Sequence, residues 1–154
     1  EMVIDVNKSY TAIFKTTKGD ISFELYPDCA PIHVNNFYIL ANLGYYDNFP
    51  VTKVLRGRYI RTGAPDKDQR ADIGYTLPAE IDMAQKKGAL VAWLHVSRDK
   101  ARSSSGSIIA MLMTYDPHGI TAHTRFGLTS EEGYNTIRLL TEEDMINKVE
   151  VIVK

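Results

Sequence analysis

The sequence has little cysteine and histidine: one cysteine, Cys29, and four histidines among 154 residues. One cysteine excludes an internal disulfide and leaves the redox compartment open. The histidines do not have the spacing of zinc ligands, so no metal or other cofactor is expected. No apolar run approaches the roughly 18 to 20 residues that a membrane-spanning helix needs, and we expect no membrane span.

Charge of neither sign predominates, since 18 lysines and arginines stand against 19 aspartates and glutamates, for a net charge of −1. No overall field favours nucleic acid or a membrane surface, so nucleic acid is not an expected partner. The composition, 44% hydrophobic and 24% charged, is that of an ordinary globular protein. A chain of this length can bury a core, and we expect one monomeric domain over residues 1–154, with residues 1–9 as an N-terminal extension.

The first residue is Glu1 rather than methionine, which indicates a piece of a longer product. A removed tag, a propeptide, or a signal or lipoprotein leader would each account for this start. Removal of a leader would place the protein outside the cytoplasm, and without a leader a cytoplasmic location is expected. The localisation therefore stays open.

Apolar and polar residues alternate along 12–16 and 21–25, on either side of a Lys-Gly-Asp turn. This period is typical of half-buried strands and predicts a hairpin over residues 10–26. Residues 149–153 alternate in the same way. We expect this terminal strand to close a sheet against the first hairpin.

Two segments have helical spacing. Pro31 suits a first helical position and Gly44 a helix end, which predicts a helix over 31–43. Thr129 and Glu132 have the spacing of a capping box, which predicts a second helix over 130–140.

The pattern in the middle of the chain indicates short strands joined by polar loops. The expected strands are 51–55, 59–63, 88–94 and 107–113. The segment 98–105 is charged and rich in serine, and we expect it to be a solvated loop. Many short strands with two isolated helices favour a mostly β, closed sheet with helices at its ends.

The stretch from Lys18 to Asp47 carries the most specific signal. It begins Lys-Gly-Asp-Ile-Ser-Phe-Glu-Leu-Tyr-Pro-Asp-Cys-Ala-Pro, continues with Val-Asn-Asn-Phe and ends with Gly-Tyr-Tyr-Asp. This order resembles the opening of the cyclophilin family of peptidyl-prolyl cis-trans isomerases, and the resemblance extends over residues 10–154. It implies a closed antiparallel β-barrel of about eight strands capped by two helices. It also implies proline-containing protein segments as partners.

Residues 46–65 fit the family's active-site segment without a gap, but the functional positions differ. The family's catalytic arginine falls on Lys53, and its substrate-binding glutamine falls on Arg61. The phenylalanine and methionine that shape the proline pocket fall on Arg58 and Tyr59. Catalysis of X-Pro rotation needs an apolar cup and a donor that stabilises the twisted imide. The resemblance thus implies Lys53 or Arg61 as the catalytic donor, although a lysine lacks the planar fork of arginine.

The opposite wall of the implied pocket also differs. A small groove-lining alanine of the family falls on Trp93, and the family's Gln-Phe-Phe is replaced by the stretch from Ile108 to Ala110. His123 matches the family's His-x-x-Phe-Gly, while His118 stands where the family has a tryptophan or leucine. Trp93 either fills the space that Ala110 vacates, which closes the pocket, or is simply a core aromatic.

These substitutions leave alternatives open. The first is a peptidyl-prolyl isomerase domain whose activity is weak or lost; the second is a non-catalytic module on the same barrel that binds peptides or anions. Lys53, Arg56, Arg58 and Arg61 form either a basic groove for an acidic peptide or small anion, or scattered solvated charges. A third reading is a structural domain of a larger exported protein.

Overall fold

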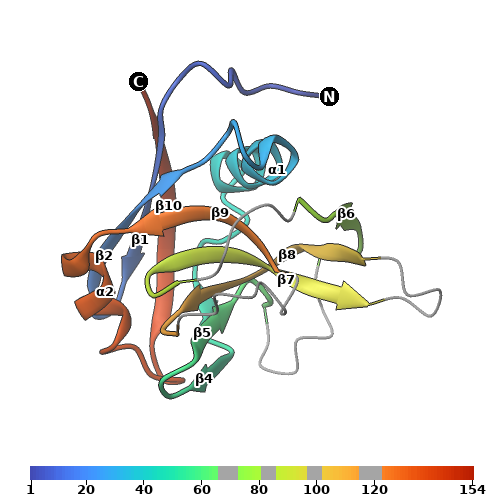
Figure 1. Cartoon of the computed structure of the whole chain (residues 1–154). Helices are drawn as coiled ribbons and strands as arrows, with labels where there is room; N and C mark the ends of the chain where they lie inside the picture. The colour runs from blue at the N-terminus through green and yellow to red at the C-terminus, as the bar shows by residue number, and fades with distance from the viewer. Residues whose placement is uncertain (66–72, 81–85, 97–101, 115–122) are drawn as a thin grey trace.

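The computed structural model describes residues 1–65, 73–80, 86–96, 102–114 and 123–154, which form a curled antiparallel sheet with two helices (Figure 1). The strands are β1 (Tyr10–Thr16), β2 (Gly19–Leu25), β3 (Phe49–Pro50), β4 (Lys53–Leu55), β5 (Tyr59–Thr62), β6 (Thr76–Pro78), β7 (Ala89–Val96), β8 (Arg102–Leu112), β9 (Thr124–Thr129) and β10 (Met145–Val153). The helices are α1 (Pro31–Asn42) and α2 (Glu131–Ile137). No helix in these ranges is long and apolar enough to cross a membrane.

The strand order explains why the sheet curls. It runs β3-β10-β1-β2-β9-β7-β8-β5-β4, with β6 paired to β8 beside this path. The two end strands, β3 and β4, are separated in sequence only by Val51 and Thr52, so the order returns to its starting point. α1 lies over one end of the curled sheet (Figure 1). The expected mostly β barrel with two helices is confirmed.

The predicted hairpin and the predicted pairing of the two ends of the chain are also confirmed. β1 pairs with β2 from Thr11 opposite Glu24 to Thr16 opposite Gly19, and β1 pairs with β10 on its other edge, with Phe14 opposite Val149. The inward alternation fills the barrel with aromatic rings: Phe14 and Phe23 meet edge to face at 5.3 Å. Such pairs add to the burial of apolar area.

The first helix begins at Pro31 and ends at Asn42, as expected, and Gly44 follows with a φ of +75°. The second helix is shorter than predicted, and its N-cap is Ser130, whose hydroxyl accepts the amide of Gly133 at 3.3 Å. Thr129, the expected cap, is the last residue of β9. Its hydroxyl donates to the carbonyl of Ser22 at 2.6 Å instead, so the predicted capping box is wrong by one residue.

The expected strand 51–55 is two strands, because the chain changes partner within it. The Val51 amide bonds to the carbonyl of Asp144 in the segment before β10, at 3.1 Å, whereas the Thr52 amide bonds to the carbonyl of Arg61 in β5, at 2.8 Å. This change of partner joins the two ends of the strand order. The sheet also contains β6 and β9, which the sequence pattern did not predict.

The expectation of a solvated loop over 98–105 is wrong for its last residues; residues 98–101 lie outside the described ranges. Ser103 to Ser105 belong to β8, and Ser104 and Ser105 are buried. The hydroxyl of Ser105 accepts the amides of Ser107 and Ile108, which satisfies short polar groups inside the barrel. Serine content alone did not reveal that these strand residues pair with both β6 and β7.

Candidate functional site

A row of paired residues crosses the outer face of the sheet and carries several predicted site residues. Lys53 of β4 lies opposite Arg61 of β5, Arg61 opposite Ala110 of β8, Ala110 opposite Val91 of β7, and Val91 opposite Arg125 of β9. Residues that pair directly present their side chains on the same face. The row therefore has two small apolar residues at its centre and basic residues at both ends.

The two central residues of this row belong to an apolar cluster that is separate from the main core. Its buried members are Ala89, Val91, Ala110 and Leu112. Tyr59 and Trp93 are partly buried and pack against it. The alternate residues of the same strands, such as Ile60 and Met111, point into the barrel and belong to the main core. The sheet thus has a buried apolar layer on its outer side at this place, with Tyr59 and Trp93 at its edge.

Arg61 lies against the two aromatic side chains of this cluster. Its guanidinium carbon is 4.7 Å from the centre of the Trp93 ring and 5.8 Å from that of Tyr59, and the two rings are 4.8 Å apart. Its Nε is buried, and among the described residues no group accepts a hydrogen bond from it. Burial lowers the pKa of Arg61, and the neighbouring Tyr59 partly opposes this. Contacts of this kind contribute about 0.5 to 2 kcal/mol and hold the guanidinium in a fixed plane.

His123 also lies against Trp93. The two rings stack at 4.3 Å with 27° between their planes. Burial and, as the smaller cause, the positive charge of Arg61 lower the pKa of His123 to about 4. The imidazole is therefore neutral at physiological pH, and the positive charge on this part of the face comes from Arg61.

The structure brings five of the predicted site residues together: Tyr59, Arg61, Trp93, Ala110 and His123. We call Tyr59, Arg61, Trp93 and His123 the arginine–aromatic cluster, with Ala110 in its floor. Trp93 packs against the apolar cluster that contains Ala110.

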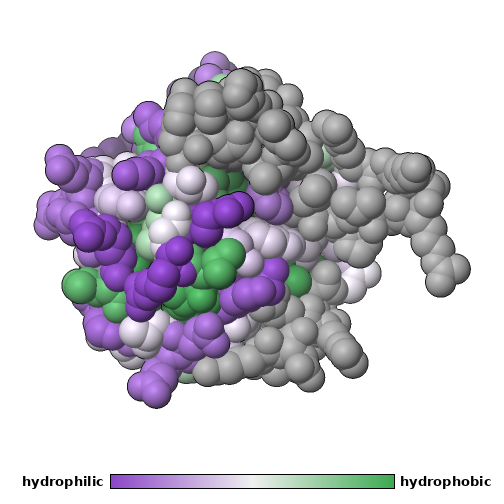
Figure 2. Space-filling view, turned by 60° about the horizontal axis from the view of Figure 1, so that its bottom comes forward, coloured by the Kyte–Doolittle hydropathy of each residue, from purple (hydrophilic) through white to green (hydrophobic). Residues whose placement is uncertain are grey.

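Three other predicted residues lie outside the arginine–aromatic cluster. Lys53 is exposed at the edge of the row, and Arg58 is exposed in the turn between β4 and β5, where its amide donates to the carbonyl of Leu55. Ile108 is buried, with 8% of its surface exposed, beside the close approach of β8 to Gly63. Figure 2 shows the molecule tilted so that the bottom of Figure 1 comes forward, and on the coloured part of this face apolar patches lie among hydrophilic residues. His118 lies outside the described ranges.

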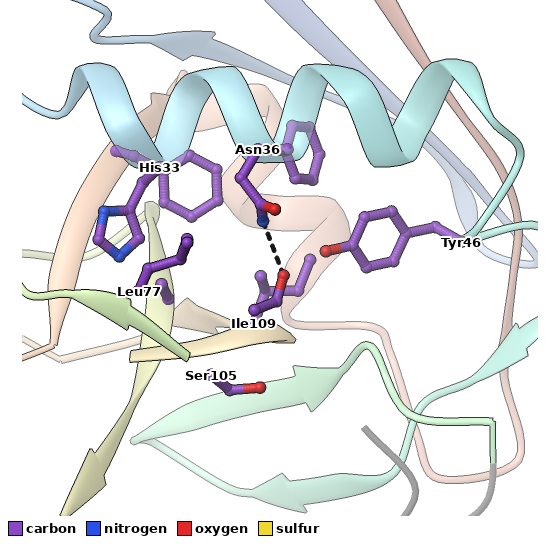
Figure 3. Close-up of a pocket in the computed structure, with 10 residues that line it drawn as sticks. His33, Asn36, Tyr46, Leu77, Ser105 and Ile109 are labelled. Carbon is purple, nitrogen blue, oxygen red and sulfur yellow. Dashed lines mark hydrogen bonds between the residues drawn. The ribbon is translucent and has the colours of Figure 1, made fainter. Parts of the chain in front are cut away.

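A second candidate site, which sequence reasoning missed, is a small pocket between α1 and the inner face of the sheet (Figure 3). His33 and Asn36 of α1 line it with Tyr46, Ser105 and Ile109, and the amide of Asn36 donates to the carbonyl of Gly106 at 2.7 Å. The only signal for it in the sequence is the Val-Asn-Asn-Phe motif, which contains Asn36. The pocket is lined by inward residues such as Ala92 and Ile109, so the sheet separates it from the arginine–aromatic cluster.

His33 in this pocket connects α1 to the segment after β6. Its Nδ1 bonds to the carboxylate of Glu80 at 2.5 Å, and the same carboxylate accepts the amides of Ile32 and His33 at 3.2 and 2.9 Å. Glu80 therefore caps a helix whose own N-cap, Ala30, has no side-chain acceptor. Burial lowers the pKa of His33, and Glu80 partly opposes this, so the imidazole is neutral at physiological pH.

Neither site provides a set of metal ligands. In the ranges that the structure describes, no three histidine, cysteine, aspartate or glutamate side chains gather closely enough to hold a metal ion. The chemistry available on the outer face is that of hydrogen-bond donation from a guanidinium next to apolar rings.

Comparison with known proteins agrees with this fold. A family model described as cyclophilin type peptidyl-prolyl cis-trans isomerase/CLD matches residues 11–153. The chain is 31% identical over 145 residues to peptidyl-prolyl cis-trans isomerase B of Bacillus subtilis, covering 92% of this chain and 97% of that protein. It is 29% identical over 142 residues to a peptidyl-prolyl cis-trans isomerase of Synechococcus elongatus, covering 92% and 95%.

Solved structures show the same fold at lower sequence identity. A cyclophilin type peptidyl-prolyl cis-trans isomerase of Cryptosporidium parvum matches with a TM-score of 0.76 at 20% identity, covering 94% of this chain and 98% of that one. The Mimivirus cyclophilin matches with a TM-score of 0.76 at 14% identity, covering 98% and 93%. The chain belongs to the cyclophilin-type peptidyl-prolyl cis-trans isomerase family.

Proposed function

We propose that this chain binds X-Pro segments of protein chains on its outer face, at the arginine–aromatic cluster, and isomerises them slowly. The observation that carries the proposal is the guanidinium of Arg61, held 4.7 Å above Trp93 next to an apolar floor. This arrangement supplies an oriented donor and apolar ring surfaces, which are the two requirements for stabilising a twisted imide.

Arg61 is a better candidate for the donor than Lys53. The resemblance puts the family's arginine at Lys53, but that side chain is exposed, and its ammonium is a point charge without a fixed direction. Arg61 lies directly opposite Lys53 on the same face and retains the planar guanidinium. We infer that the donor role has moved by one strand.

The slow rate follows from the floor of the site. Trp93 packs beside Ala110, and Arg58 occupies the exposed turn where the family has an apolar residue, so the cup for a proline ring is shallow and partly filled. A crystal structure of the Cryptosporidium parvum protein was determined in the presence of the dipeptide Ala-Pro. This supports a proline-containing ligand here without fixing its sequence.

The test is an exchange-NMR or protease-coupled isomerisation assay with an uncharged X-Pro peptide. We expect a rate above the spontaneous one but well below that of an ordinary cyclophilin assayed in parallel, and we expect it to fall to the spontaneous rate in Arg61→Ala. Lys53→Ala should retain most of it. Loss of activity in Lys53→Ala with retention in Arg61→Ala would place the donor at Lys53 instead.

The alternative is a non-catalytic module that binds peptides or anions, and the filled floor next to Trp93 favours it. The same assay separates the two functions. Binding of the uncharged peptide, measured by calorimetry, with no acceleration at any protein concentration would identify a binding module.

A further inference from the structure

The strongest unexplained feature of the outer face is the charge of Arg61. Its Nε is buried and has no hydrogen-bond acceptor among the described residues, and burial lowers its pKa, so the guanidinium is partly removed from water. A positive charge in this situation is costly unless an anion or several acceptors compensate it.

No acidic side chain of the described ranges forms an ion pair with this residue. The ion pairs found there join Lys15 to Asp20, Lys18 to Asp144 and Lys148 to Glu150. Lys53, directly opposite Arg61 in the β4–β5 ladder, is not among them either. Two cations therefore lie next to each other at one end of the row, and the neighbouring His123 is neutral.

We propose that Arg61, held against the rings of Trp93 and Tyr59, is a carboxylate receptor, so that this face prefers proline-containing segments with a carboxylate next to the proline. A planar guanidinium binds a carboxylate through two parallel hydrogen bonds, which a lysine cannot do. The rings beside it offer apolar surface to the proline ring. This inference rests on the proposed function and names the class of its ligand.

Two sources supply such a carboxylate. One is the side chain of an aspartate or glutamate adjacent to the proline, and the other is the terminal carboxylate of a chain that ends in proline. In either case a guanidinium paired with a carboxylate is not free to donate to the imide. Acidic ligands should therefore bind more tightly than neutral ones, have a lower turnover, and inhibit isomerisation of a neutral peptide.

The experiment uses the fluorescence of Trp93, which is the only tryptophan of the chain and lies in the site. Acetylated, amidated peptides with Glu-Pro or Gln-Pro at their centre form one pair, and peptides ending in Ala-Pro as free acid or amide form the other. We expect the carboxylate member of at least one pair to bind about five- to tenfold more tightly at low salt. The preference should shrink as the salt concentration rises, because the charges are partly exposed. The peptide pair that shows this preference identifies whether the side-chain or the terminal carboxylate is recognised.

Variants test whether Arg61 is responsible. Arg61→Gln should abolish the preference while the neutral peptides still bind, and Arg61→Lys should retain only part of it. Lys148→Gln, which removes one positive charge from β10, is the matched control and should leave the preference unchanged. Equal affinity within both pairs, or a preference that survives in Arg61→Gln, would overturn the inference. If the neutral peptides neither bind nor isomerise, the proposed function itself fails, whereas equal binding of all peptides refutes the carboxylate receptor alone.

Discussion

Acidification should produce a titration of Trp93 fluorescence that is displaced far below the usual range of histidine. His123 stacks on Trp93 at 4.3 Å, and a protonated imidazole in contact with an indole changes its emission. The pKa of His123 is lowered from 6.5 to about 4, first by burial and second by the charge of Arg61. We therefore expect a midpoint near pH 4, with the fold checked by far-ultraviolet circular dichroism at each point.

The lowered pKa of His123 also makes the stability of the fold depend on pH. Between about pH 6.5 and pH 4 the unfolded chain binds a proton at His123 that the folded chain does not, so the free energy of unfolding falls as the pH falls. At about 1.4 kcal/mol per pH unit, the full difference is at most about 3.5 kcal/mol, lost once the pH is below the folded pKa. His33 has a lowered pKa as well, so the effect of His123 is the difference between the wild type and His123→Gln.

Two variants complete this prediction. His123→Gln should abolish the fluorescence titration. It should also remove the contribution of His123 to the pH dependence of the free energy of unfolding, measured in urea. Arg61→Gln should raise the midpoint, but not to the value of a solvated histidine, because burial is the larger cause of the lowered pKa. A wild-type midpoint near pH 6.5 would refute the stacked, buried position of this ring.

Three further predictions concern the backbone at Gly63, the carboxylate of Asp144 and the ring of Trp93. Gly63→Ala should lower the free energy of unfolding, measured in urea, by about 3 kcal/mol or more, because φ is +101° and a Cβ would lie 2.1 Å from the carbonyl oxygen of Ser107. Gly57→Ala is the control: φ is also positive there but the space is open, so the loss should be about 1 kcal/mol. Equal losses in the two variants would contradict the close approach at Gly63. Asp144→Asn should cost about 2 to 3 kcal/mol at neutral pH. Burial raises the pKa of Asp144, but hydrogen bonds from Lys18, Thr17 and Thr141 lower it by more, so the net pKa lies below the usual value. The ionised carboxylate therefore stabilises the fold above its usual pKa, and the difference in unfolding free energy between the wild type and Asp144→Asn should vanish in strong acid. Trp93→Ala should weaken binding of an uncharged proline peptide in calorimetry, because it removes the ring that holds Arg61 and offers apolar surface to the proline, and tighter binding would show that the ring only fills the floor.

Local sequence patterns by themselves determined much of the barrel. Alternation along 12–16, 21–25 and 149–153 predicted the strands that pair at the two ends of the chain, and Pro31 with Gly44 bounded the first helix. These signals depend on the period of a strand and on backbone geometry at single residues, which neighbouring residues encode. The motif frame from Lys18 to Asp47 then named the family, and the substituted positions beyond it supplied candidate site residues.

Which of the substituted residues meet depends on contacts between distant parts of the chain. The stacking of Arg61 and His123 on Trp93 brings together β5, β7 and the residue just before β9, and its geometry follows from the register of these strands. The same holds for the capping of α1 by Glu80, 47 residues beyond His33, and for the change of partner between β3 and β4. Periodicity shows which face of a strand or helix a residue occupies relative to its neighbours in sequence. The contacts that set charge and pKa on this face join residues that are distant in sequence, so they become determined only when the sheet curls and its register is fixed.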